Sequence, residues 1–142
     1  MKDRKILVPV DGSPLSTRTI QRMIELKGSI TFPLTLLHVL DLNTISYRGF
    51  AETDFRDIEE RARQGAGQFV AEQQALLTAA GIQAETLVME GSPREIICSL
   101  AESGTYDLIV IGKPTESEMH NLLFGQVANH VIHHIRCPVL LV

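Results

Sequence analysis

The chain alternates short apolar segments with longer amphipathic ones, and this rhythm constrains its fold more than any other feature. The apolar segments are residues 6–10, 34–40, 83–89, 107–111 and 138–142. Most of them are almost continuously apolar, which is typical of strands that are buried on both faces of a parallel sheet. The pattern therefore predicts an α/β fold with five mostly parallel strands, separated by four helices that cover both faces of the sheet.

The segments between the predicted strands carry helix signals. Ser13 and Pro14 supply an N-cap and a first-turn proline for a helix after the first strand. A long amphipathic helix is expected over residues 54–80, where Gly81 stops it. Its expected inward side chains are Phe55, Ile58, Ala62, Phe69, Val70, Leu76 and Leu77.

Two further helices follow in the second half of the chain. Ser92 and Glu95 are expected to form a capping box at the start of one, and residues 121–134 form the other. Residues 41–53 show no clear period, so they are predicted to be a mobile loop.

Length, charge and cysteine content exclude several classes of function. The 142 residues fit one domain spanning residues 1–142. A formal net charge of −4 without a run of Lys and Arg argues against nucleic-acid binding. No apolar stretch approaches the length of a membrane span. Cys98 and Cys137 lie far apart inside apolar segments, which favours buried, reduced thiols in a cytoplasmic protein.

The ends of the predicted strands carry candidate ligand-binding residues. In wound parallel sheets, ligands bind at the carboxyl ends of the strands, where the winding reverses. That edge would bring together the segment Pro9, Val10 and Asp11 with Val39 and Gly112.

A glycine pair suggests a bound phosphate chain at this edge. Gly112 follows a buried strand, and Gly125 with Gln126 precedes a helix. Glycines at such points let backbone N–H groups approach an anion, and the helix start adds its positive dipole end. Lys113 lies within the same segment and could meet a phosphate.

Several of these motifs together resemble the universal stress protein family, in its small single-domain form, over the whole chain. They are residues 6–13 (ILVPVDGS), His38 with Val39, residues 91–93 (GSP), residues 107–112 (DLIVIG) and residues 137–142 (CPVLLV). The resemblance implies a doubly wound, adenine nucleotide alpha hydrolase-like fold with strand order 3-2-1-4-5. It also implies a homodimer in which the last strand, from Val139 to Val142, pairs with its counterpart.

The resemblance further implies a site for ATP, AMP or ADP, with or without magnesium. One branch of the family binds ATP through glycine, two residues, glycine, nine residues, glycine, then Ser or Thr. Asp11 matches the position that faces the ribose or phosphates, and Val39 the position that faces the adenine. Gly112 and Gly125 match the first and third glycines, and Val127 follows as part of the same site.

Two substitutions separate the chain from the nucleotide-binding branch. Thr115 stands in place of the middle glycine, where a β-branched residue suits a positive φ poorly, although its hydroxyl can donate. Gln126 stands in place of the Ser or Thr; its amide can donate, but its bulk would crowd a phosphate. The alternative is therefore a stress protein that binds no nucleotide and acts by association with a protein partner.

The sequence contains few motifs that would indicate an enzyme. Walker-type loops, nucleophile elbows and CxxC pairs are absent, so the chain is not expected to be an enzyme beyond slow, incidental ATP hydrolysis. His130 and His134 stand one helical turn apart, but two imidazoles without a third ligand argue weakly for a metal. The predicted role is a regulatory binding module, in which nucleotide orders residues 112–125 and changes the surface that a partner meets.

Overall fold

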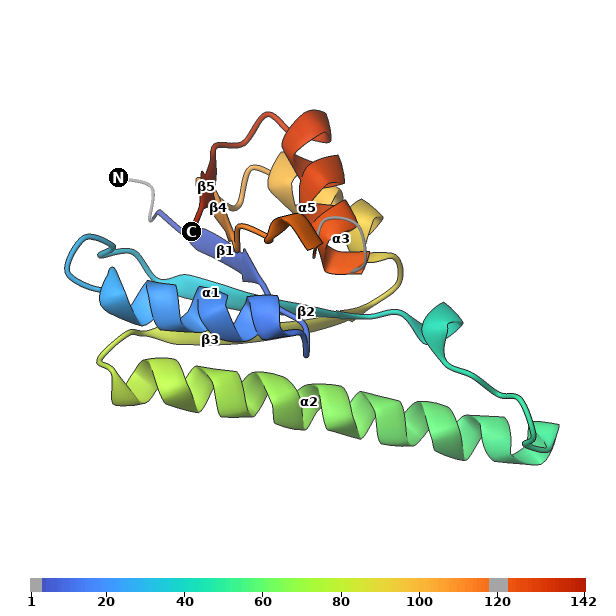
Figure 1. Cartoon of the computed structure of the whole chain (residues 1–142). Helices are drawn as coiled ribbons and strands as arrows, with labels where there is room; N and C mark the ends of the chain where they lie inside the picture. Colours follow the sequence, from blue (N-terminus) through green and yellow to red (C-terminus); the bar gives the residue numbers. More distant parts are fainter. Residues whose placement is uncertain (1–3, 118–122) are drawn as a thin grey trace.

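The computed structural model describes residues 4–117 and 123–142, which form a wound α/β domain (Figure 1). The strands are β1 (Ile6–Pro9), β2 (Leu34–Leu40), β3 (Ala84–Glu90), β4 (Leu108–Ile111) and β5 (Val139–Leu141). The helices are α1 (Pro14–Glu25), α2 (Phe55–Ala79), α3 (Pro93–Glu102) and α5 (Leu123–His134).

The five strands form one sheet in the order β3-β2-β1-β4-β5, which confirms the expected topology. Every neighbouring pair is parallel. In the centre of the sheet, Ile6 of β1 stands beside Leu34 of β2 on one side and Leu108 of β4 on the other. The carboxyl ends of β1 and β2 therefore meet at one edge of the domain.

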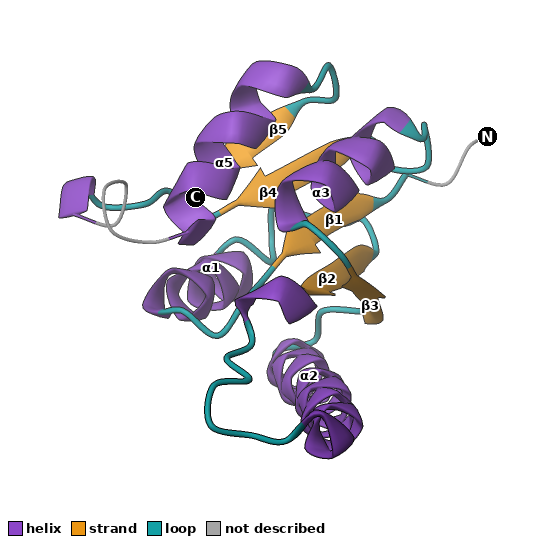
Figure 2. Cartoon of the chain, turned by 90° about the vertical axis from the view of Figure 1, so that its right-hand side faces the viewer, coloured by secondary structure: helices purple, strands orange, loops and turns teal. Residues whose placement is uncertain are grey.

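Helices cover both faces of the sheet, as the apolar strands predicted. Figure 2 shows α3 and α5 on one face and α1 and α2 on the other. Alternate residues of β1 divide between two buried clusters: Leu7 packs with residues of α3 and α5, whereas Ile6 and Val8 pack with residues of α1 and α2. This division explains why β1 is apolar at every position.

Local sequence signals account for the starts of α1 and α3, although one predicted contact is absent. Ser13 caps α1, because its side chain accepts from the backbone N–H of Ser16, and Pro14 opens the helix. The capping box expected at Ser92 and Glu95 is wrong, since the Ser92 side chain makes no capping hydrogen bond. Pro93 opens α3 instead, and its fixed φ is already suited to a first helical turn.

The long helix α2 matches its predicted range to within one residue at each end, but its buried face is narrower than expected. Val70 and Leu77 are buried as predicted, whereas Leu76 is 53% exposed. Two adjacent helical residues point about 100° apart, so only one of Leu76 and Leu77 can face the sheet fully. Ala66 is buried and was not predicted to be.

Residues 41–53, predicted to be a mobile loop, contain one short 3₁₀ helix and the start of a second. They are η1 (Leu42–Thr44) and η2 (Glu52–Asp54). The carboxylate of Asp41 accepts from the backbone N–H of Asn43 and so stabilises the first of these turns. In the part of the chain that the structure describes, no helix is both long and apolar enough to cross a membrane.

Candidate functional site

A cavity of about 200 Å³ opens at the carboxyl ends of β1 and β2. One wall comes from these two strands and from the turns that follow them, and the other from the start of α3 and from α5. The lining residues are Pro9, Val10, Asp11, Leu37, His38, Val39, Leu40, Asp41, Thr44, Pro93, Ile97 and Val127. Most of these side chains are apolar, and the polar groups lie at the strand ends, as is usual for small-molecule sites.

The turn from β1 into α1 holds Asp11 in a fixed position. Its Oδ1 accepts from the backbone N–H of Ser13 (2.9 Å) and from the hydroxyl of Ser16 (2.9 Å). The hydroxyl oxygen of Ser16 in turn accepts from the backbone N–H of Asp11 (2.7 Å). Both of these hydrogen bonds go to Oδ1 of Asp11. Its other carboxylate oxygen can therefore accept from a ligand hydroxyl without any change in the turn.

His38 connects the two strands below the cavity. Its Nδ1 donates to the carbonyl oxygen of Val10 (3.0 Å), and its ring meets the ring of Phe69 edge-on, with centroids 5.1 Å apart. His38 is therefore satisfied within the fold, as expected for a core histidine, but it also lines the cavity.

Five of the ten residues predicted for the site line this cavity. They are Pro9, Val10, Asp11, Val39 and Val127. Four of them lie at or just after the ends of β1 and β2, because parallel strands end at the same edge of the sheet, and Val127 comes from α5.

The residues after β4 are placed differently. Gly112 is buried against α1: a Cβ at this position would lie 2.1 Å from Thr19 Oγ1 and 2.8 Å from Leu15 Cδ1. Close helix packing alone therefore accounts for glycine here. Lys113 donates its backbone N–H to Val142 and lines a separate hollow beside β5, and the Thr115 hydroxyl lies 3.2 Å from that of Ser117.

The remaining two predicted residues, Gly125 and Gln126, lie in the first turn of α5. This helix also carries Val127, which lines the cavity. The segment of residues 112–125, predicted to become ordered on binding, includes residues 118–122, which lie outside the described residues.

Several lining residues were not predicted as site residues. Asp41 and Thr44 follow β2 and belong to a stretch without sequence periodicity, which hid their position. Pro93 and Ile97 come from α3. Asp41 could have been found from its place directly after a buried strand, the same signal that identified Asp11.

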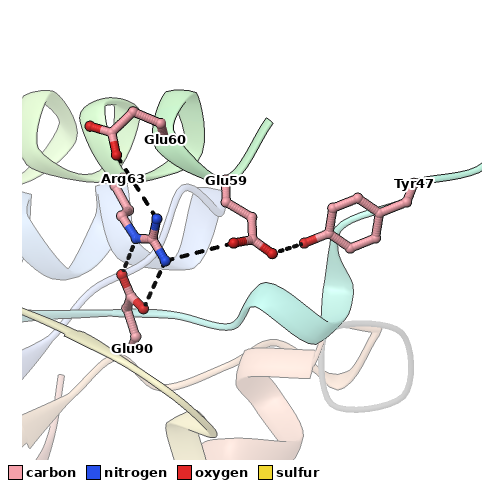
Figure 3. A network of polar contacts seen from close by, with 5 residues as sticks. All are labelled: Tyr47, Glu59, Glu60, Arg63 and Glu90. Carbon is pink, nitrogen blue, oxygen red and sulfur yellow. Dashed lines mark hydrogen bonds and ion pairs between the residues drawn. The ribbon is translucent and has the colours of Figure 1, made fainter. Parts of the chain in front are cut away.

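A polar network ties the loop beside the cavity to α2 and β3 (Figure 3). The hydroxyl of Tyr47 donates to Glu59 Oε1 (2.8 Å). Arg63 donates through Nε to Glu90 at the end of β3, and its other nitrogens lie 3.8 Å from Glu59 and 3.9 Å from Glu60. The network fixes the loop that carries Asp41 against two regular elements.

The hydrogen bonds and charges of this network shift the pKa values of its side chains. The hydrogen bond from Arg63 lowers the pKa of Glu90, and the bond to Glu90 raises the pKa of Arg63. The bond to Glu59, followed by burial, raises the pKa of Tyr47.

Other groups singled out from the sequence lie outside the cavity. The rings of His130 and His134 stack with centroids 4.0 Å apart, and Nδ1 of His134 donates to the carbonyl oxygen of His130 (2.7 Å). Within the described ranges, no three His, Cys, Asp or Glu side chains gather as a metal site would require. Cys98 and Cys137 are free thiols and are only partly buried, and burial raises the pKa of each.

The fold is a doubly wound parallel sheet with a cavity at the carboxyl ends of its strands. This arrangement is typical of one class of α/β domains, in which ligands bind at those strand ends. The sequence model of the universal stress protein family matches residues 3–142. The chain belongs to the universal stress protein family.

Individual relatives agree with this assignment. The chain is 28% identical over 140 residues to universal stress protein MJ0531 of Methanocaldococcus jannaschii, covering 98% of this chain and 81% of that protein. It is 27% identical over 144 residues to universal stress protein YxiE of Bacillus subtilis, covering 97% of each.

Solved structures show the same fold. Hypothetical protein MJ0577 superposes with a TM-score of 0.79 at 25% identity, covering 100% of this chain and 96% of that protein. Two more distant structures hold ligands. A universal stress protein in complex with cAMP has a TM-score of 0.68 at 20% identity, covering 98% of this chain and 96% of that one. A universal stress protein family protein from Arabidopsis thaliana with AMP bound has a TM-score of 0.65 at 21% identity. The match covers 98% of this chain and 90% of that one.

Proposed function

We propose that this chain is a regulatory module that binds an adenine nucleotide in the cavity at the carboxyl ends of β1 and β2. The observation that carries the proposal is the meeting of Pro9, Val10, Asp11, Val39 and Val127 around one hollow. The sequence predicts all five as site residues, and they come from β1 and the turn after it, from β2 and from α5. The cAMP and AMP complexes of family members support an adenine nucleotide as the ligand.

The lining suits the parts of a nucleoside. Val39 is partly exposed and offers apolar surface for a purine ring, while Ile97 and Val127 form the almost fully buried floor behind it. The carboxylate of Asp11 accepts hydrogen bonds and can hold ribose hydroxyls. ATP, ADP and AMP share this nucleoside, and magnesium would accompany the longer phosphate chains.

The proposed role is signalling, not catalysis. A bound nucleotide would favour one arrangement of the loop that carries Asp41 and Thr44, because both residues line the cavity. The network of Tyr47, Glu59 and Arg63 would pass that preference to α2. A protein partner that contacts this surface would then sense occupancy.

Titration calorimetry of the nucleotide-stripped protein with AMP and ATP tests the proposal. Micromolar binding to the parent protein is expected. Val39→Phe should weaken it about tenfold or more, because the added ring occupies a large share of a 200 Å³ cavity. Val88→Phe is the matched control, since Val88 lies on the neighbouring strand β3 and does not line the cavity. Equal loss in both variants, or no binding by the parent, would contradict the proposal.

A second candidate function is association with a protein partner without any nucleotide. Two observations favour it: Gly112 is explained by packing against α1, and the Thr115 hydroxyl meets Ser117. Under this alternative no nucleotide would copurify with the protein, and Gln126→Ser would create binding that the parent lacks.

We also propose that the chain forms a homodimer through β5. This strand lies at one margin of the sheet, and its Leu140 and Leu141 are exposed. β3 lies at the other margin and carries Glu85 and Glu90, charges of the kind that discourage pairing between edge strands. β5 holds no charged residue, so it is the edge better suited to pair with a second copy.

A further inference from the structure

We infer that the cavity selects the nucleoside end of its ligand and takes an adenine nucleoside or its monophosphate in preference to the free triphosphate. Asp41 is the residue assigned to discriminate against a longer phosphate chain. This inference rests on the proposed function, because it concerns the ligand of the same cavity.

Size is the first argument. A cavity of about 200 Å³ is smaller than the roughly 300–1,000 Å³ of sites that enclose a drug-sized ligand. It has room for part of a nucleotide. The mostly apolar lining, with Val39 partly exposed in it, favours the base as that part, so a phosphate chain would extend outward past the polar strand ends.

Charge at the strand ends is the second argument. Among the twelve described lining residues, the carboxylates are Asp11 and Asp41, and none is Lys or Arg. Two carboxylates repel a chain that carries several negative charges, and each added phosphate increases the repulsion.

The two cations that adjoin the predicted site, Lys113 and Arg94, are not among the described residues that line the cavity. Lys113 lines the separate hollow beside β5. Arg94 follows the lining residue Pro93 but does not itself line the cavity. A single phosphate at the rim of the cavity is compatible with the two carboxylates of Asp11 and Asp41. A chain of three phosphates would be repelled by them more strongly.

Asp41→Asn isolates the charge without disturbing the turn. The side chain of Asp41 accepts from the backbone N–H of Asn43 (3.0 Å), and an asparagine oxygen can accept the same bond. Asp54→Asn is the matched control: Asp54 lies at the other end of the same loop, is exposed, makes no side-chain capping bond and does not line the cavity.

Calorimetry with adenosine, AMP and ATP in the presence of EDTA tests the inference on the intact chain. The parent should bind adenosine and AMP with similar affinity and ATP at least about tenfold more weakly, with the deficit shrinking as salt rises. Asp41→Asn should improve ATP binding about fivefold and leave adenosine unchanged, while Asp54→Asn changes neither. Thermal unfolding of each variant verifies folding, and Asp41→Ser, which keeps a hydroxyl acceptor for the turn, should repeat the effect.

The outcomes separate this inference from the function on which it rests. ATP binding as tightly as AMP, or equal gains for adenosine and ATP in Asp41→Asn, would overturn the selectivity and leave nucleotide binding standing. If none of the three compounds binds, the proposed function fails, and the selectivity fails with it.

Discussion

At the scale of single residues, Gly112 shows how closely α1 approaches the end of β4. A Cβ at this position would lie 2.1 Å from Thr19 Oγ1 and 2.8 Å from Leu15 Cδ1. Gly112→Ala should therefore lower the free energy of unfolding by about 1–3 kcal/mol, as overpacked core substitutions do. Urea unfolding measures this change.

Two further variants sharpen that measurement. Thr19→Ala combined with Gly112→Ala should recover part of the loss, because it removes the nearest clashing atom. Gly12→Ala is the control, since its Cβ would meet nothing within 4 Å. If Gly112→Ala unfolds like the parent, the packing account is wrong. If it is destabilised, weaker nucleotide binding by this variant cannot be taken as the loss of a phosphate contact.

Arg63 gives the surface network a pH dependence. Its hydrogen bond lowers the pKa of Glu90, so this contribution to stability is present above the unfolded-state pKa of a glutamate, about 4.3. It is lost as pH falls through the lower folded-state value. Arg63→Gln should therefore lower the melting temperature slightly at pH 7 and have progressively less effect below pH ~4.

The control for this prediction is Arg22→Gln. Arg22 pairs with Glu25 within α1, so its loss leaves the tie between α2 and β3 intact. Thermal melts from pH 3 to 7 provide the comparison. A gap between Arg63→Gln and the parent that stays constant across this range would rule out Glu90 as its source.

At the scale of elements, α2 carries two exposed glycines that weaken it. Gly65 and Gly67 lie within the helix, and a Cβ at either would meet nothing within 4 Å. Gly65→Ala and Gly67→Ala should each stabilise the protein by about 0.5–1 kcal/mol in urea unfolding. Gly81→Ala, just past the same helix, should instead destabilise it by roughly 1–2 kcal/mol, because φ is +84° there. Stabilisation by all three substitutions would refute this reasoning.

The elements were largely predictable because their signals are local. β2 spans residues 34–40 as expected, and the end of α2 lies within one residue of its prediction because Gly81 stops the helix. The exposure of Leu76 was missed because an apolar residue next to a buried one looks the same in a sequence. Whether the Ser92 side chain bonds its helix depends on its rotamer, which its neighbours in sequence do not determine.

The site was predictable only where it follows from topology. Asp11 and Val39 could be placed together because parallel strands end at one edge. Asp41 and Thr44 belong to an aperiodic loop, and the position of this loop against α2 depends on the contact between Tyr47 and Glu59, which lie twelve residues apart. Lys113 looked like a phosphate ligand in sequence, but it lies beside Val142 at the far margin of the sheet.

At the scale of the whole molecule, the two margins of the sheet differ in a way that predicts assembly. Leu140 on β5 is 39% exposed and Val88 on β3 is 38% exposed, so the two strands offer similar apolar side chains to solvent. Only β3 carries glutamates along its length. Since charge on an edge strand opposes pairing with another copy, we expect association through β5.

Sizing chromatography with light scattering tests this prediction with one pair of variants. The parent should elute as a dimer, and Leu140→Lys should give monomers, because it places a charge on the edge that must pair. Val88→Lys adds the same charge at the same exposure on the opposite edge and should leave the dimer intact. A monomer from Val88→Lys with a dimer from Leu140→Lys would move the interface to β3. A monomeric parent would mean that an uncharged edge of only three residues is too short to hold two copies together.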